Sequence, residues 1–270
     1  MNLNRTSTYF IGAFLIGLLF TIPGMTAFAE TEFNPNIEQI KQNDVVYLGE
    51  NHDRLDHHQQ QLEIITQLHE DAANDLAIAL EMFQRPFQPI LDRYLEDKID
   101  ENQLRQQSEY DTRWGFDWEF YAPILRFAKA NQIPVIALNT PEEITTKVAE
   151  QGINNLEGSD FRYIPSLSEI DLSNREYRQR LNNIYQQHVE QGQGNSKDAD
   201  NFFAAQVLWD ETMASAIAHY YQNYPQSQIV VLVGKAHVMY DYAIPDRVDK
   251  RINDPSFTQT TLLLEEAENE

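Results

Sequence analysis

The residues best suited to chemistry stand where short apolar runs end. Glu50 and His52 follow the run VVYLG, Glu81 lies in the run LAIALEM, and His237 follows IVVLVG. A carboxylate and an imidazole together can bind a divalent metal ion or act as an acid–base pair near neutral pH. A carboxylate in an apolar strand is costly to bury alone, so Glu81 is expected to have a metal, an arginine or a histidine as its partner.

A structural interpretation of these residues stays open beside the functional one, because Glu81 could instead hydrogen-bond to a helix N-terminus. In open parallel sheets, ligands bind outside the carboxyl ends of the strands. Asn139 and Lys235 also stand at predicted strand ends. Polar groups that converge at successive strand ends favour a ligand-binding or catalytic site.

His57 and His58 follow the Glu50–His52 corner at the start of a helical pattern. Histidines on the polar side of a helix are common, so we expect this pair to face solvent and to take no part in the site, with the alternative that His58 faces the same cleft as His52. No role is predicted for the histidines further along the chain at helical positions, which are His69, His188 and His219.

The elements that position these residues alternate between strands and helices. Continuous apolar runs predict strands at 45–49, 76–82, 133–139 and 229–234, with a final edge strand at 258–264. Helical patterns cover 53–73, 86–107, 118–130, a segment from Pro141, 174–190, 197–223 and 245–252, whereas 152–172 is predicted as loop. This order predicts an α/β fold with a mostly parallel central sheet of about four to five strands, helices on both faces and a helical insertion.

Composition limits the partners of this 270-residue chain. The formal net charge of −22 repels nucleic acid and anionic lipid headgroups. No cysteine is present, which excludes disulfides, thiolate metal sites and a lipid-bearing cysteine. The motifs G-x-G-x-x-G, Walker A, G-x-S-x-G and H-E-x-x-H are also absent, so nucleotide binding and serine-hydrolase chemistry are not expected.

The N-terminus has the pattern of a secretory signal peptide. Arg5 provides a positive start, an apolar run covers 9–20, and the sequence AFA at 27–29 fits a small-residue cleavage site. We therefore expect residues 1–29 to be a signal peptide and 30–270 a single α/β domain. The alternative is an uncleaved membrane anchor, but the apolar run is short for a span and is interrupted by Pro23 and Gly24. The protein is expected to be exported to a periplasmic or extracytoplasmic location, without a lipid anchor and without a later integral membrane segment.

Six segments resemble one known family in its order along the chain. They are VVYLGENHD, AIALEMF, RWGFDWEFYAPIL, IPVIALNTP, AAQVLWDETMA and GKAHV. The chain resembles the ChaN-like haem-binding uptake proteins, from a superfamily that also contains Tiki-type proteins and erythromycin-esterase-like enzymes. The resemblance extends from about residue 44 to residue 252.

The resemblance implies a parallel-sheet α/β domain with a shared site at its carboxyl edge. The residues that match the family's site are Glu50, His52, Glu81 and His237, and Asp210 of the WDETMA segment joins them. These five are the expected ligands if the site holds a divalent metal, and the first four are the expected catalytic residues if the protein is an enzyme.

The resemblance also implies haem binding, with tyrosine ligation of the iron at a surface that two subunits can share. A homodimer is therefore an expectation. Tyr240, Tyr242 and Tyr121 are the candidate tyrosines in that order, and His52 and His237 are further candidates for cofactor contact. The loop after His237 reads VMYDYAIPDR and lacks the glycines usual in the family, which should stiffen the rim of the site.

Two function classes follow. The first is an exported haem- or iron-binding protein in haem uptake or handling. The alternative is a metal-dependent hydrolase in which the Glu50, His52, Glu81 and His237 cluster activates water around an ion. A third interpretation is an interaction module in which this cluster no longer acts.

Overall fold

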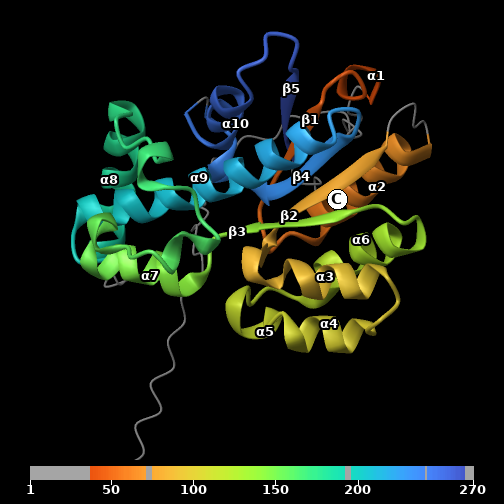
Figure 1. Cartoon of the computed structure of the whole chain (residues 1–270), viewed down its shortest axis with the longest axis horizontal. Coiled ribbons are helices and arrows are strands. Elements are labelled where there is room, and N and C mark those ends of the chain that lie inside the picture. Colours follow the sequence, from red (N-terminus) through yellow and green to blue (C-terminus); the bar gives the residue numbers. More distant parts are fainter. Residues whose placement is uncertain (1–36, 71–74, 192–195, 241, 265–270) are drawn as a thin grey trace, which may run out of the picture.

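The computed structural model describes residues 37–70, 75–191, 196–240 and 242–264 (Figure 1). The predicted signal peptide lies outside these residues. The strands are β1 (Val45–Glu50), β2 (Leu76–Gln84), β3 (Val135–Asn139), β4 (Gln228–Gly234) and β5 (Gln259–Leu263). The helices are α1 (Ile37–Ile40), α2 (Leu55–Glu70), α3 (Gln88–Leu95), α4 (Glu101–Gln107), α5 (Tyr110–Arg113), α6 (Trp118–Ala130), α7 (Glu142–Gln151), α8 (Arg175–Glu190), α9 (Ala199–Asn223) and α10 (Ile244–Ile252). None of these described helices is long and apolar enough to cross a membrane.

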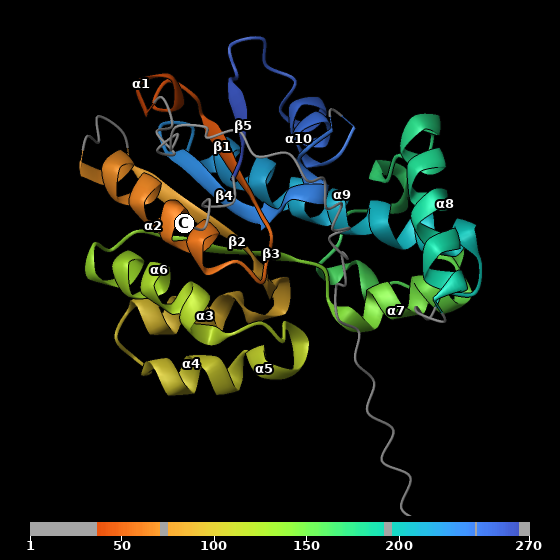
Figure 2. The ribbon, with the colours of Figure 1, turned by 180° about the vertical axis from the view of Figure 1, so that it is seen from behind.

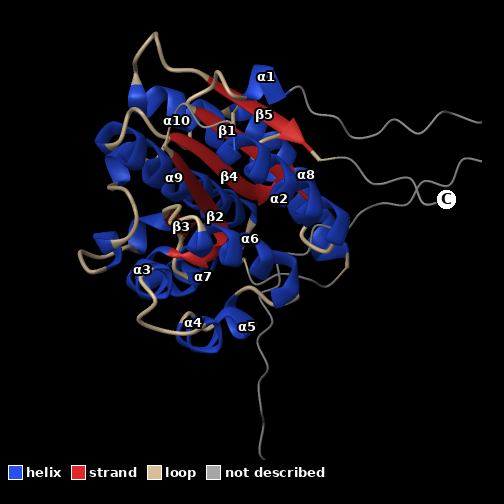
Figure 3. Ribbon diagram, turned by 90° about the vertical axis from the view of Figure 1, so that its right-hand side faces the viewer, coloured by secondary structure: helices blue, strands red, loops and turns tan. Residues whose placement is uncertain are grey.

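The five strands form one parallel sheet in the order β3-β2-β4-β1-β5 (Figure 3). This confirms the predicted α/β fold. All residues of β1 to β4 are buried, as their continuous apolar sequences predicted. The segment predicted as loop at 152–172 contains three short 3-10 turns, at Ile153–Asn155, Asp160–Arg162 and Leu167–Glu169.

Each face of the sheet carries its own apolar core. Alternate strand residues such as Leu48 and Leu232 pack with α2, α3 and α6, while Tyr47 and Val231 pack with α9 and α10. Figures 1 and 2 show α2, α3 and α6 on one side of the sheet and α9 with α10 on the other. Both views place α7 and α8 beside the N-terminal half of α9, where they form the helical insertion.

The chain path switches direction at the carboxyl edge of the sheet. The segments after β1 and β2 lead to one face of the sheet, and those after β3 and β4 lead to the other. Strand β4 lies between β1 and β2, so neighbouring strands send the chain in opposite directions on both sides of it. In open α/β sheets this switch in direction is where ligands bind.

A buried ion pair fastens α10 to α9, and the loop before α8 joins the same contacts. Glu211 accepts hydrogen bonds from the Arg247 guanidinium, from Arg251 at 2.5 Å and from the backbone N–H of Asp171 at 2.9 Å. Glu211 and Arg247 are almost fully buried. Because Glu211 follows Asp210 directly, the same contacts hold the part of α9 that contributes to the polar cluster.

We expect Glu211→Ala to lower the free energy of unfolding by about 3 kcal/mol, because it leaves a buried arginine without its carboxylate. Urea unfolding followed by circular dichroism measures this change. Glu150→Ala, an exposed residue of α7, is the control and should change stability little. An equal effect of the two substitutions would contradict the role of the buried pair.

Candidate functional site

The first half of the site is built around Glu50, the last residue of β1. Its carboxylate is buried and accepts hydrogen bonds from Tyr121 at 2.6 Å and from Gln61 at 2.5 Å, while Nδ1 of His52 lies 2.7 Å from Oε1. Gln61 belongs to α2 and Tyr121 to α6, the helices that cover this face of the sheet. The β1–α2 corner therefore holds a carboxylate–imidazole dyad against two helices.

The second half comes from the opposite face. Nδ1 of His237 lies 2.6 Å from Asp210 Oδ1, and the Tyr177 hydroxyl donates to Asp210 Oδ2 at 2.6 Å. Asp210 lies in α9 and Tyr177 in α8, whereas His237 ends the 3-10 turn Lys235–His237 that follows β4. The result is a second buried carboxylate–imidazole dyad, with a tyrosine on the carboxylate as in the first.

Glu81 lies between the two dyads. Its Oε2 accepts a 2.7 Å hydrogen bond from the Gly234 N–H, and its Oε1 lies 3.6 Å from Nε2 of His237. Backbone pairing between β2 and β4 ends at Leu80. Beyond that point, the Glu81 carboxylate accepts the Gly234 N–H in place of a backbone carbonyl of β2. A Cβ at Gly234 would lie 2.7 Å from Nε2 of His52, and glycine is therefore required for His52 to approach Glu81.

The buried charges set the protonation of both histidines. Burial opposes the charged imidazole of His237, but Glu81 and Asp210 outweigh it and raise the pKa of His237 to about 9. Burial opposes the charge on His52 as well, but Glu50 and Glu81 raise the pKa of His52 overall. Burial would raise the pKa of Glu50, yet its hydrogen bond and charge interaction with His52 lower it. The neighbouring carboxylates therefore favour the protonated form of both imidazoles.

His57 and His58 are buried, so the prediction that they face solvent was wrong. Nδ1 of His57 accepts the Asn51 N–H at 3.0 Å, and Nε2 of His58 lies 3.1 Å from the carbonyl oxygen of His52. Burial lowers the pKa of His57 and favours its neutral form, which can accept that hydrogen bond. Both rings hold the backbone of the corner that presents His52, a role that the helical pattern alone did not reveal.

The family follows from a sequence comparison. The model for the family described as haem-binding uptake, Tiki superfamily, ChaN matches residues 36–248. The chain belongs to this ChaN family. A plant relative, the chloroplastic protein RETICULATA-RELATED 5 of Arabidopsis thaliana, is 26% identical over 232 residues, which cover 82% of this chain and 31% of the relative. The chain thus spans about a third of that relative's length.

Solved structures share the ChaN-family fold. The ChaN of Campylobacter jejuni, described with cofacial heme binding, is 20% identical with a TM-score of 0.66 and covers 88% of each chain. A mutant erythromycin esterase in its open conformation is 11% identical with a TM-score of 0.50, covering 84% of this chain and 71% of its own. At these identities the likeness shows the fold alone.

The candidate tyrosines of this ChaN-family chain lie in different settings. Tyr121 is fully buried with its hydroxyl committed to Glu50, and burial raises the pKa of Tyr121 well above its usual range. Tyr240 and Tyr242 are half-buried, and their rings stack at 5.4 Å and 9°. Tyr242 also stacks on Tyr177 at 4.9 Å, which connects this pair to the Asp210 dyad.

The cluster does not support the expected divalent-metal site. Across the described residues, no group of three or more His, Asp or Glu side chains could hold a metal ion. The oxygens of Glu50 and Asp210 already accept hydrogen bonds from neighbouring side chains.

An aromatic wall beside His52 completes this side of the site. The rings of Trp114 and Phe116 lie 4.8 Å and 5.1 Å from the His52 ring. Both residues belong to the WGFDWEFY segment, whose aromatic richness was the available sequence signal. Gln61 and Tyr177 carried no such signal, because their spacing resembles that of ordinary residues on a helix face.

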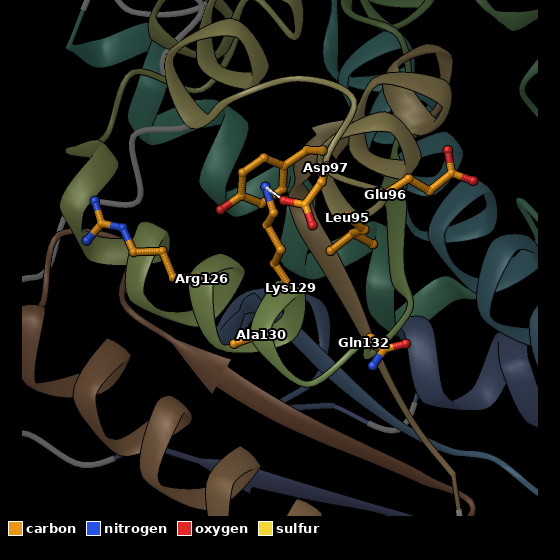
Figure 4. A pocket seen from close by; sticks show the side chains of 8 residues that line it. Leu95, Glu96, Asp97, Arg126, Lys129, Ala130 and Gln132 are labelled. Atoms are coloured by element: carbon orange, nitrogen blue, oxygen red, sulfur yellow. Dashed lines mark ion pairs between the residues drawn. The ribbon is translucent and has the colours of Figure 1, made fainter.

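A separate hollow of about 590 Å³ lies at the other edge of the sheet (Figure 4). It is found where α3 and α6 end, close to the start of β3, and its lining comprises Tyr94, Leu95, Glu96, Asp97, Arg126, Lys129, Ala130 and Gln132. Lys129 pairs with Asp97 at 2.7 Å, and Arg126 pairs with Glu101 at 2.7 Å. Its charged side chains therefore already have ion-pair partners, and the hollow lies away from the polar cluster.

Protonation of His237 should make stability depend on pH. The pKa of His237 rises from the ordinary 6.5 to about 9 on folding. The stabilisation of the fold by protonated His237 is therefore fully present below pH 6.5 and is lost as the pH rises through about 9. We expect the free energy of unfolding to fall by about 3 kcal/mol over this interval, and His52 adds in the same direction. Asp210→Asn should reduce the fall, because it removes one of the charges that hold the proton.

Urea unfolding at a series of pH values measures the stability, and NMR of the histidine Cε1–H groups follows the titration directly. Asp75→Asn makes the same chemical change at an exposed position and serves as the control. A pH dependence that is the same for wild type and Asp210→Asn would show that Asp210 does not hold the proton on His237.

Proposed function

We propose that this protein binds haem at the loop after His237 and acts in haem or iron uptake or handling. The single observation that supports it best is the parallel pair Tyr240 and Tyr242, half-buried beside the polar cluster. We further propose that the chain is exported after removal of residues 1–29 and acts in the periplasm or another extracytoplasmic space, without a lipid anchor.

The residues of this loop meet the chemical needs of haem. Haem requires an apolar aromatic surface, an axial ligand for the iron and partners for its propionates. Tyr240 and Tyr242 offer aromatic faces and phenol oxygens, and the Arg180 guanidinium lies 3.7 Å from the centroid of the Tyr240 ring. We assign the axial ligand to Tyr240 or Tyr242 and a propionate contact to Arg180. Bound haem would bring the iron that uptake requires.

The other candidate ligands fit this role less well. The Tyr121 hydroxyl is buried and bonded to Glu50. His52 and His237 are each 8% exposed and face Glu81, with Nδ1 already bound to a carboxylate. We therefore place them behind the haem surface. The cofacial arrangement described for the Campylobacter jejuni protein supports a proposal that two copies of this chain share that surface as a homodimer.

Haemin titration tests the binding proposal. We expect the wild-type chain to give a Soret band that saturates, and the double variant Tyr240→Phe/Tyr242→Phe to lose the band, because phenylalanine cannot ligate iron. Tyr163→Phe, a half-buried tyrosine on another loop, is the control. An unchanged spectrum in the double variant would show that neither tyrosine is the axial ligand, and the absence of a Soret band in the wild type would refute haem binding.

A second candidate, hydrolysis, is favoured by the two dyads. Glu50–His52 and Asp210–His237 each orient an imidazole by a carboxylate, with Nδ1 to oxygen distances of 2.7 Å and 2.6 Å. A positioned imidazole can transfer protons to and from a reacting ester. Because the described residues supply no group of metal ligands, we assign the chemistry to the imidazoles themselves.

Ester hydrolysis tests the second candidate. With p-nitrophenyl acetate, His52→Ala and His237→Ala should each lower kcat/KM by about 100-fold, the usual contribution of a general acid or base. His219→Ala removes an exposed histidine of α9 and is the control. Equal rates for wild type and all three variants would rule out catalysis by this cluster.

A further inference from the structure

Three polar side chains at the carboxyl ends of β2 and β3 have no partner in the described structure. Arg85 follows β2 directly, makes no hydrogen bond or ion pair there and is half-buried. Oδ1 of Asn139, the last residue of β3, is buried without a hydrogen-bond partner, and so is Oγ1 of Thr140. Buried polar groups are normally paired, so the unpaired oxygens of Asn139 and Thr140 require an explanation.

The three residues are neighbours across the sheet. The register of β2 and β3 pairs Gln84 with Asn139. Arg85 and Thr140 are the residues that follow this pair after each strand. The Gln84 side chain is already occupied, since its Oε1 accepts from Arg113 at 2.9 Å and from the backbone N–H of Glu142 at 3.3 Å. The surrounding structure thus satisfies Gln84 and leaves the other three polar groups unpaired.

This group borders the polar cluster. Leu80 pairs with Ala137, so Glu81 and Asn139 are both within two residues of that pair on adjacent strands. Arg113, which holds Gln84, immediately precedes Trp114, which packs on His52 at 4.8 Å. The unpaired groups therefore extend the carboxyl edge one strand beyond Glu81, on the side away from β1.

An unpaired arginine is unexpected in this chain, because 42 acidic residues are available against 20 basic ones. Burial lowers the pKa of Arg85, and no nearby charge acts on it. Guanidinium groups bind carboxylates well, often through two parallel hydrogen bonds. The Asn139 oxygen can only accept, and it therefore needs an N–H or O–H donor.

We propose that Arg85, Asn139 and Thr140 form a subsite for a small ligand that carries a carboxylate next to an N–H or O–H group, as N-acylated amino acids do. Arg85 binds the carboxylate, and Asn139 accepts the hydrogen bond of the neighbouring donor. Thr140 can donate or accept. This subsite is separate from the haem surface at Tyr240 and Tyr242.

Calorimetric titration of the full chain with N-acetylglycine at low ionic strength tests the subsite, with acetate as the probe that lacks the donor. N-acetylglycine should bind more tightly than acetate, and Arg85→Gln should weaken its binding by about tenfold or more. Arg175→Gln removes a charge from an exposed position of α8 and should leave binding unchanged. Failure of N-acetylglycine to bind, or equal binding by wild type and Arg85→Gln, would overturn the proposal.

The stability of Thr140→Val gives an independent result. If the Thr140 hydroxyl serves only to bind a ligand, its replacement by valine removes a buried unpaired hydroxyl from the ligand-free protein. The Tm should then rise by about 2–4 °C. Thr146→Val, on a half-exposed face of α7, is the matched control. A fall in Tm specific to Thr140→Val would show that the hydroxyl serves the fold and would overturn its assignment.

Haemin titration of Arg85→Gln separates this subsite from the proposed haem surface. We expect its Soret titration to match the wild type. Loss of haemin binding in this variant would show that Arg85 binds a haem propionate. It would then overturn the proposal that Arg85 binds a ligand other than haem. If the wild type binds N-acetylglycine but no haemin, the haem proposal fails while the subsite stands.

Discussion

The structure depends on the burial of three carboxylates at one edge of a parallel sheet. Glu50, Glu81 and Asp210 are at most 4% exposed, and a buried carboxylate is tolerated only if hydrogen bonds and opposite charges replace its water. Two histidines, two tyrosines, a glutamine and one backbone N–H meet this requirement. The raised pKa values of His52 and His237 are a direct consequence of it.

Chain topology explains how the partners reach these carboxylates. Because β4 lies between β1 and β2, helices from both faces reach the same carboxyl edge of the sheet. Helices α2 and α6 support the Glu50 dyad, and α8 and α9 support the Asp210 dyad. Gly234 stands at the centre, where a larger residue would displace His52. The stacked tyrosines after His237 extend the second dyad toward the surface, where the ChaN-family resemblance leads us to propose haem.

The predictable part of this architecture came from local patterns with a clear physical cause. Strands buried on both faces must be continuously apolar, which made β1 to β4 recognisable. The helix at Trp118–Ala130 matched its predicted bounds, with Asp117 accepting the N–H of Glu119 at its start. His57 and His58 were misplaced, because helical spacing does not show which side of a short polar segment faces the sheet corner.

The sequence by itself determined the strand ends and the residue types that follow them, because burial and chain reversal constrain each strand locally. It therefore named Glu50, His52, Glu81 and His237 as polar groups at one edge. Only the tertiary structure decided their partners. Gln61 and Tyr177 owe their roles to contacts between segments far apart in the chain. Pairing and protonation depend on distances of a few ångströms, which are set by helix packing and strand order and not by local sequence.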